Sequence, residues 1–266
     1  MTSPSRPKRS RLPQATLSEH DGVRYLHLDT PWVQGAMRIA RPQFIELDYV
    51  QRMLASLLWR PSETLSDAAP EGHALQLGLG AGTITRFTLN ALGMPTTVVE
   101  LNPEVIAACH AWFRLPRDAA LLDVQLADAG AWVNSAAAKR MQAEVSLLHI
   151  DLYDHEAAAP VLDDESFYAA CRALLAEGGV ASINLFGREL SFERSLSRIA
   201  AAFGSDQVWQ LRPTLEGNTV VVAGRGVVVP GREALKSRAL NLEHRFMRLG
   251  LRATQWLHMV SPYQTG

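Results

Sequence analysis

The sequence has no run of roughly 18 or more uncharged apolar residues, which a membrane-spanning helix would need. Its only two cysteines, Cys109 and Cys171, cannot build a disulfide framework, and they lack the spacing of a metal knuckle. The formal net charge is −1, so the chain has no broad field that would attract nucleic acid or a membrane surface. These absences indicate a cytoplasmic protein that binds neither nucleic acid nor membrane.

Composition and patterning divide the chain into four segments. Residues 1–14 are basic and rich in proline, and they predict a disordered tail. Residues 15–60 predict a β-rich module that ends in a helix, and residues 71–225 predict one larger domain. Residues 226–266 predict a helical extension, because Arg232 to about Leu249 has helical character.

Within the larger domain, short apolar strands alternate with helices. This alternation predicts an α/β fold with a doubly wound, mostly parallel sheet of the Rossmann-like kind. The expected strands are 74–79, 97–100, 124–128, 144–151 and 180–185, followed by two candidates for antiparallel strands at 208–211 and 218–223. The expected helices are 42–59, 84–92, 103–113, 132–139, 166–175 and 192–203. We expect Glu177-Gly178-Gly179 to stop the helix at 166–175.

A short glycine loop follows the first strand of this domain. Gly78, Gly80 and Gly82 form a G-x-G-x-G pattern, in which glycines permit a tight turn and a close approach of a ligand to the backbone. A purely structural turn is the alternative. No lysine follows the glycines, which excludes a P-loop.

Acidic residues end the next two strands. Glu100 lies 22 residues after Gly78, where a carboxylate can accept hydrogen bonds from both ribose hydroxyls. Asp128 ends the following strand and is a candidate for the adenine amino group. The alternatives are a solvated carboxylate at Glu100 and a helix N-cap at Asp128.

The fourth strand ends in Asp151-Leu152-Tyr153-Asp154. Asp151 and Asp154 together favour a cation and can accept a proton from an amine. Capping or solvation would also explain the two acids, and Tyr153 either lines an acceptor pocket or packs. A glycine loop with three strand-end acids suits a nucleoside without phosphates, so S-adenosylmethionine or a relative of it fits better than NAD.

These residues resemble the spermidine/spermine synthase family, the polyamine aminopropyltransferases on a class I methyltransferase-like fold. The resemblance covers about residues 22–225. It is carried by Leu75–Gly82, Val98–Ile106, Ala127-Asp128-Ala129, Asp151-x-x-Asp154, Ser166-Phe167-Tyr168 and Trp32-Val33-Gln34-Gly35.

The resemblance implies a role for each matching residue. Gln34, Glu100 and Asp128 would hold the nucleoside, Asp151 would act on the attacking amine, and Asp154 would hold the other end of a polyamine. The donor would be S-adenosylmethionine or its decarboxylated form, and transfer of the aminopropyl group would release methylthioadenosine without a metal. The resemblance also implies a homodimer.

The sequence departs from the family pattern at two places. Ala81 stands where the family has an aspartate that pairs with the ammonium group of the donor, and His155 replaces a proline after the second aspartate. An S-adenosylmethionine-dependent methyltransferase and a non-catalytic nucleoside-binding protein therefore remain alternatives. Two residues of the early helix, Tyr49 and Gln51, either reach the pocket or only pack.

Overall fold

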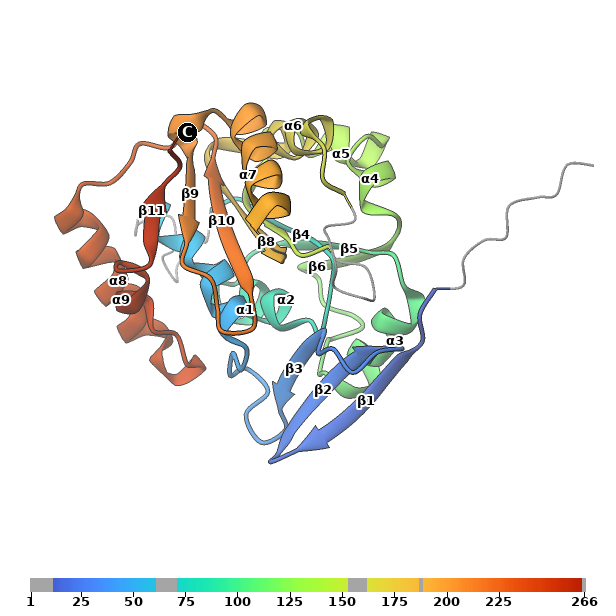
Figure 1. Cartoon of the computed structure of the whole chain (residues 1–266). Coiled ribbons are helices and arrows are strands. Elements are labelled where there is room, and N and C mark those ends of the chain that lie inside the picture. The colour runs from blue at the N-terminus through green and yellow to red at the C-terminus, as the bar shows by residue number, and fades with distance from the viewer. Residues whose placement is uncertain (1–11, 61–70, 153–161, 187–188, 265–266) are drawn as a thin grey trace, which may run out of the picture.

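A computed structural model describes residues 12–60, 71–152, 162–186 and 189–264. Its main feature is an eight-stranded sheet in the order β11-β9-β10-β8-β7-β4-β5-β6 (Figure 1). The neighbours from β6 to β8 pair in parallel, whereas β10, β9 and β11 extend the sheet by antiparallel pairing. The strands are β4 (His73–Leu77), β5 (Thr96–Glu100), β6 (Leu122–Leu126), β7 (Val145–Ile150), β8 (Leu175–Phe186), β9 (Val208–Leu211), β10 (Asn218–Gly224) and β11 (Val260–Pro262). The predicted α/β class with a mostly parallel sheet is confirmed.

Helices cover both faces of this sheet. They are α1 (Asp48–Met53), α2 (Thr83–Arg86), α3 (Pro103–Trp112), α4 (Ala129–Trp132), α5 (Ala136–Arg140), α6 (Glu165–Leu174), α7 (Glu189–Phe203), α8 (Arg232–Phe246) and α9 (Ala253–Trp256). The helix predicted at 42–59 is shorter, because α1 continues as a 3₁₀ helix over Leu54–Trp59. The helix predicted at 132–139 is two short helices, and the second is capped by Ser135, whose hydroxyl accepts from the Ala138 amide. No helix among the described residues is long and apolar enough to cross a membrane.

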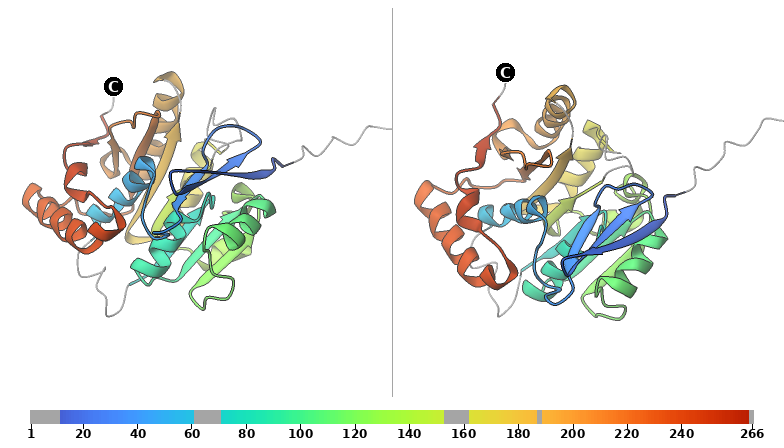
Figure 2. Two further views of the ribbon diagram at one scale, coloured as in Figure 1. Left: turned by 90° about the horizontal axis from the view of Figure 1, so that it is seen from below. Right: turned by 60° about the horizontal axis from the view of Figure 1, so that its bottom comes forward.

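A separate three-stranded antiparallel sheet precedes the main one. It contains β1 (Ala15–His20), β2 (Val23–Leu28) and β3 (Gly35–Arg38), and it lies next to α3 (Figures 1 and 2). Asp21 and Gly22 join β1 to β2 with φ angles of 50° and 74°. Positive φ at both central residues is typical of a type I′ hairpin turn, which the Asp-Gly pair favours. That pair is the sequence signal for the hairpin of β1 and β2 within the predicted β-rich module.

Two segments differ from the sequence expectations. The predicted helix at 166–175 is α6, but Glu177-Gly178-Gly179 does not cap it, because α6 ends at Leu174 and the glycines lie inside β8. Gly178 has φ +72°, and its N–H donates to the Arg225 carbonyl. The pairing of β8 with β7 shifts register here, from Val145–Leu175 to Leu147–Val180, as it does at a β-bulge. Near the end of the described chain, β11 pairs with β9 and adds an edge strand where only helix was expected.

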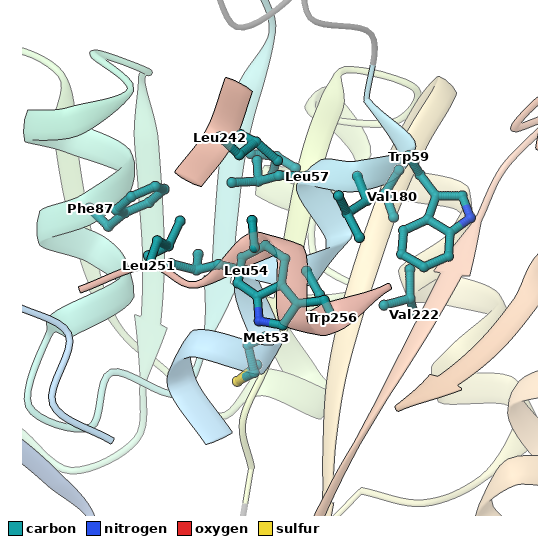
Figure 3. Packing of buried hydrophobic residues seen from close by; sticks show 14 of the residues in the cluster. Met53, Leu54, Leu57, Trp59, Phe87, Val180, Val222, Leu242, Leu251 and Trp256 are labelled. Carbon is teal, nitrogen blue, oxygen red and sulfur yellow. The ribbon is translucent and has the colours of Figure 1, made fainter. Parts of the chain in front are cut away.

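The core lies mainly in two layers, one on each face of the main sheet. On one face, the 3₁₀ helix after α1 packs with α8 and α9 over Val180 and Val222 (Figure 3). On the other face, α4 to α7 cover β7 and β8. A third, smaller cluster joins α3 to the N-terminal sheet through Leu26 and Met37. This smaller cluster fixes the N-terminal module against the carboxyl ends of β4 and β5.

One buried histidine makes stability depend on pH. The His149 ring on β7 is 1% exposed, its Nδ1 lies 2.7 Å from the Ser182 hydroxyl, and burial lowers its pKa to about 4. The unfolded chain therefore binds a proton at this ring between pH 6.5 and about 4, while the folded chain does not. We expect this difference to remove about 3 kcal/mol of folding free energy as the pH falls through that window.

The variant His149→Asn tests this expectation, because its amide can still reach Ser182 but does not titrate. Denaturant unfolding measured at several pH values should show a flatter decline between pH 6.5 and 4 for the variant than for the wild type. Equal slopes would show that His149 is not responsible.

Candidate active site

A cavity of about 630 Å³ lies where the N-terminal module meets the carboxyl edge of the main sheet. The chain crosses from β6 back to β7 here, so β4 and β7 flank the point where the strand order reverses. Open α/β sheets bind ligands at such a point. The N-terminal module contributes Leu12, Pro13, Leu26, Leu28, Pro31, Trp32, Val33 and Gln34 to the lining. The main domain contributes residues that follow or end β4, β5, β6 and β7, the end of β8, and the turn before β10.

The glycine loop brings two chain segments into close contact. Gly78 has φ +87°, and a Cβ there would lie 2.1 Å from the Asp151 backbone oxygen. Gly80 has φ +52°, and a Cβ there would lie 3.0 Å from the Gln34 backbone oxygen. Gly78 and Gly80 line the cavity, whereas Gly82, with φ +67°, is the residue before α2 and does not line it.

A buried arginine supports this loop from behind. Arg86 is 1% exposed and donates to the backbone oxygens of Ala81 and Phe113 at 2.6 and 2.7 Å. Burial lowers its pKa to about 10, so the guanidinium stays charged at neutral pH. Its hydrogen bond to the Ala81 carbonyl fixes the backbone of the glycine loop at Ala81.

Glu100 lies at the end of β5, as expected, and lines the cavity. Its two carboxylate oxygens accept hydrogen bonds from the backbone N–H groups of Leu79 (2.9 Å) and Asn102 (2.7 Å). Burial raises the pKa of Glu100, and these N–H donors partly offset the increase. The carboxylate is thus held in one orientation at the cavity wall.

Asp128 also lines the cavity, but it has the structural role that was the alternative. Its Oδ1 accepts from the Ala131 N–H at 2.8 Å and so caps α4. A capped carboxylate keeps a second oxygen, so the N-cap does not prevent a contact with a ligand. The adenine contact stays a prediction.

Asp151 lies at the centre of a hydrogen-bond network. Asn184, at the end of β8, donates to Asp151 Oδ1 at 2.9 Å, and the Tyr49 hydroxyl donates to Oδ2 at 3.3 Å. Asn218, at the start of β10, donates to the Asn184 side-chain oxygen at 3.1 Å and fixes the direction of that amide. Burial raises the pKa of Asp151, with the two donors acting in the opposite direction.

This network shows which residue of the early helix, Tyr49 or Gln51, reaches the cavity. It also contains residues that sequence reasoning missed. Tyr49 reaches the cavity, whereas Gln51 donates to the Ile45 backbone oxygen at 3.0 Å and only packs. Asn184 and Asn218 carry no motif that would mark them. They meet because β10 runs antiparallel to β8, so that the start of one strand lies beside the end of the other.

The remaining expected site residues divide into two groups. Gln34 lines the cavity at the entrance to β3. Tyr153, Asp154 and His155 lie outside the described residues, so their expected roles stay predictions.

The charge of the lining is one-sided. Five carboxylates line the cavity, namely Asp48, Glu100, Asp128, Asp151 and Glu216, while none of its described lining residues is lysine or arginine. Of these, Asp48 also pairs with Arg52 at 2.7 Å. The cavity therefore favours a cationic ligand.

The sheet order, the glycine loop and the acid that ends β5 define a Rossmann-like protein of the methyltransferase-like fold class. Human methyltransferase-like protein 13 in complex with SAH has this fold, with a TM-score of 0.67 and 20% identity over 76% of this chain and 93% of that one. A probable spermidine synthase from Corynebacterium glutamicum has the same fold, with a TM-score of 0.68 and 20% identity over 85% of this chain and 83% of that one.

Similarity in sequence is more specific. The chain is 29% identical over 243 residues to a polyamine aminopropyltransferase of Chromobacterium violaceum. The aligned region covers 91% of this chain and 88% of the relative. No family model matches the chain. The resemblance to polyamine aminopropyltransferases that the motifs indicate is confirmed by this relative.

Proposed function

We propose that the chain is an enzyme of the aminopropyltransferase kind, which binds an S-adenosylmethionine-type nucleoside and transfers an aminopropyl group to an amine. The observation that carries the proposal is the cavity with five carboxylates and no lysine or arginine among its described lining residues. The donor of such a transfer is a sulfonium cation, and a polyamine acceptor keeps positive charge on the amino groups that do not react. The 29% identity to a polyamine aminopropyltransferase supports the same reaction.

The cavity divides into two halves with different chemistry. The glycine loop, Glu100 and Asp128 line the half that we assign to the nucleoside, where Glu100 would accept hydrogen bonds from the ribose hydroxyls. Asp151, Tyr49 and Asn184 form the half that suits the amine. Gln34 belongs to the N-terminal module and lies beside Gly80 of the glycine loop, where it would contact the ligand.

In the proposed reaction, the neutral amine nitrogen attacks the methylene carbon next to the sulfonium. A carbon–nitrogen bond forms, the carbon–sulfur bond breaks with its electron pair going to sulfur, and methylthioadenosine leaves. Asp151 accepts the proton that the amine loses, and its fixed orientation keeps that proton acceptor aligned. The proposal assigns the other end of a polyamine to Asp154 and an acceptor contact to Tyr153.

The position of Ala81 bears on the choice of donor. Ala81 is 3% exposed and does not line the main cavity, and its Cβ lies 2.5 Å from where a Cβ on Gly35 would be. The lining offers acidic side chains and, among the described residues, no side-chain cation for the carboxylate of ordinary S-adenosylmethionine. We therefore propose decarboxylated S-adenosylmethionine as the donor.

We expect the protein to bind decarboxylated S-adenosylmethionine at least tenfold more tightly than the ordinary form, because an unpaired carboxylate would face like charges. Calorimetry of both donors and of methylthioadenosine on one preparation measures this. Preference for the ordinary donor would contradict the proposal and favour methyl transfer. Absence of binding by all three would favour a non-catalytic role.

Three further parts of the proposal come from the resemblance or the composition. They are a homodimer, a cytoplasmic location and a reaction that needs no metal. Sedimentation of the purified protein and activity in the presence of a chelator test the first and the third.

A further inference from the structure

The segment before β1 forms one wall of the cavity. Leu12 and Pro13 line it together with Leu28 from the end of β2. The sequence indicated a disordered tail up to residue 14, yet Leu12 and Pro13 line the cavity and Gln14 makes backbone hydrogen bonds. The Gln14 N–H donates to Asp29 Oδ2 at 2.8 Å, and its carbonyl accepts from the Asp29 N–H at 3.2 Å.

Two residues at the start of α3 hold this segment. The Asn102 side-chain nitrogen donates to the Pro13 carbonyl at 2.7 Å, and Glu104 Oε2 accepts from the Ala15 N–H at 3.0 Å. Asn102 is 5% exposed and borders the cavity. The wall is therefore tied to the helix that follows the ribose-binding candidate Glu100.

Three of the hydrogen bonds of Asn102 have different purposes. Its backbone N–H donates to Glu100 Oε1 at 2.7 Å, and its side-chain oxygen accepts from the Glu104 N–H at 3.0 Å, which caps α3. The third bond, to the Pro13 carbonyl, needs an N–H donor. Aspartate and serine cap helices as well as asparagine does, but neither offers that amide donor.

We propose that Asn102 is a positioning residue that holds Leu12 and Pro13 as the outer wall over the nucleoside half of the cavity. The inference rests on the proposed function only in taking a nucleoside as the ligand of that half. The side-chain amide of Asn102 couples the wall to the Glu100 loop, so the nucleoside binds tightly only while the wall is in place.

The variants Asn102→Asp and Asn102→Ser test the proposal, because both keep a preferred N-cap and both lose the bond to Pro13. We expect each to bind methylthioadenosine about tenfold more weakly than the wild type, as measured by calorimetry. Methylthioadenosine carries no net charge, so the added charge of the aspartate has little direct effect on it. Leu12→Ala acts on the wall itself and should weaken binding in the same direction.

A matched control lies outside the cavity lining. Gln207 likewise uses both ends of its side-chain amide on backbone groups, although both belong to one residue: it accepts from the Val227 N–H at 2.8 Å and donates to the Val227 carbonyl at 3.3 Å. Gln207→Glu should leave methylthioadenosine affinity unchanged. In transfer assays, the Asn102 variants should raise the KM of the donor while the KM of the amine stays constant, which a general loss of structure would not produce.

Wild-type affinity in both Asn102 variants would overturn the inference, and so would weak binding by the aspartate variant alone. Weak binding accompanied by a lowered Tm, with both KM values raised, would assign Asn102 a structural role and would also overturn it. Failure of the wild type to bind methylthioadenosine would overturn the nucleoside site itself. The first three results leave the proposed function standing, and only the last removes it.

Discussion

The substitution Asp151→Asn is expected to reduce aminopropyl transfer by a factor of at least about 100, the lower range for loss of a general base. Asparagine matches aspartate in size but cannot accept the proton that the attacking amine loses. It would also place an amide opposite the donors of Asn184 and Tyr49, which now point at the carboxylate. Turnover with saturating donor and a series of amines measures the loss.

Binding of methylthioadenosine separates this effect from a general collapse of the site. The nucleoside half depends on Glu100 and the glycine loop. The affinity of Asp151→Asn for methylthioadenosine should therefore remain within about threefold of the wild type. Asp123→Asn, which removes an exposed carboxylate from β6 outside the cavity lining, is the matched control and should keep full activity. Full transfer by Asp151→Asn would contradict the assignment of the base.

The pH dependence of the wild type gives a second readout on the same group. Burial raises the pKa of Asp151 above its ordinary value of 3.8. If its carboxylate accepts the proton, kcat/KM should fall on the acid side at a pH above 3.8, and that limb should be absent from the residual activity of Asp151→Asn.

The substitution Gly78→Ala is expected to have the second large effect, on folding and on the site together. Its Cβ would lie 2.1 Å from the Asp151 backbone oxygen, and its φ of +87° is strained for alanine. Neither backbone is free to move, because Gly78 donates to the Val99 carbonyl and Asp151 donates to the Leu77 carbonyl, both at 2.9 Å. We expect a loss of about 3 kcal/mol or more and no measurable nucleoside binding.

Gly178→Ala isolates the part of this effect that comes from backbone conformation alone. Gly178 has φ +72°, and a Cβ there would meet nothing within 4 Å. Denaturant unfolding should therefore show a loss of about 1 kcal/mol, the cost of a left-handed alanine. Similar losses for the two variants would show that the contact with Asp151 is not rigid.

How far the site could be predicted depended on where its residues lie in the chain. Gly78 and Asp151 each follow a parallel strand directly and Glu100 ends one, so the strand pattern alone placed them at one edge. The network that orients Asp151 comes instead from Tyr49, Asn184 and Asn218, which no local pattern marks. Their meeting depends on antiparallel pairing and on the packing of α1, which are tertiary properties.

The fold shows the same division. The alternation of strands and helices was sufficient for the class of the main sheet, because each crossover is short and local. The bend inside β8 was mistaken for a helix stop, because a glycine pair has the same local signature in both settings. For Asp128, a helix cap and a ligand contact require the same residue at the same place, and the sequence does not separate them.

The turn before β10 has a consequence for how such a protein can diversify. Thr214 and Asn218 close this turn through a backbone hydrogen bond of 2.8 Å, and Glu216 within it borders the cavity. The turn reaches the carboxyl edge of the parallel strands only because β10 runs in the opposite direction. The glycine loop and Glu100 lie on other connections, so we expect substitutions in this turn to alter the proposed amine half without changing the proposed nucleoside half.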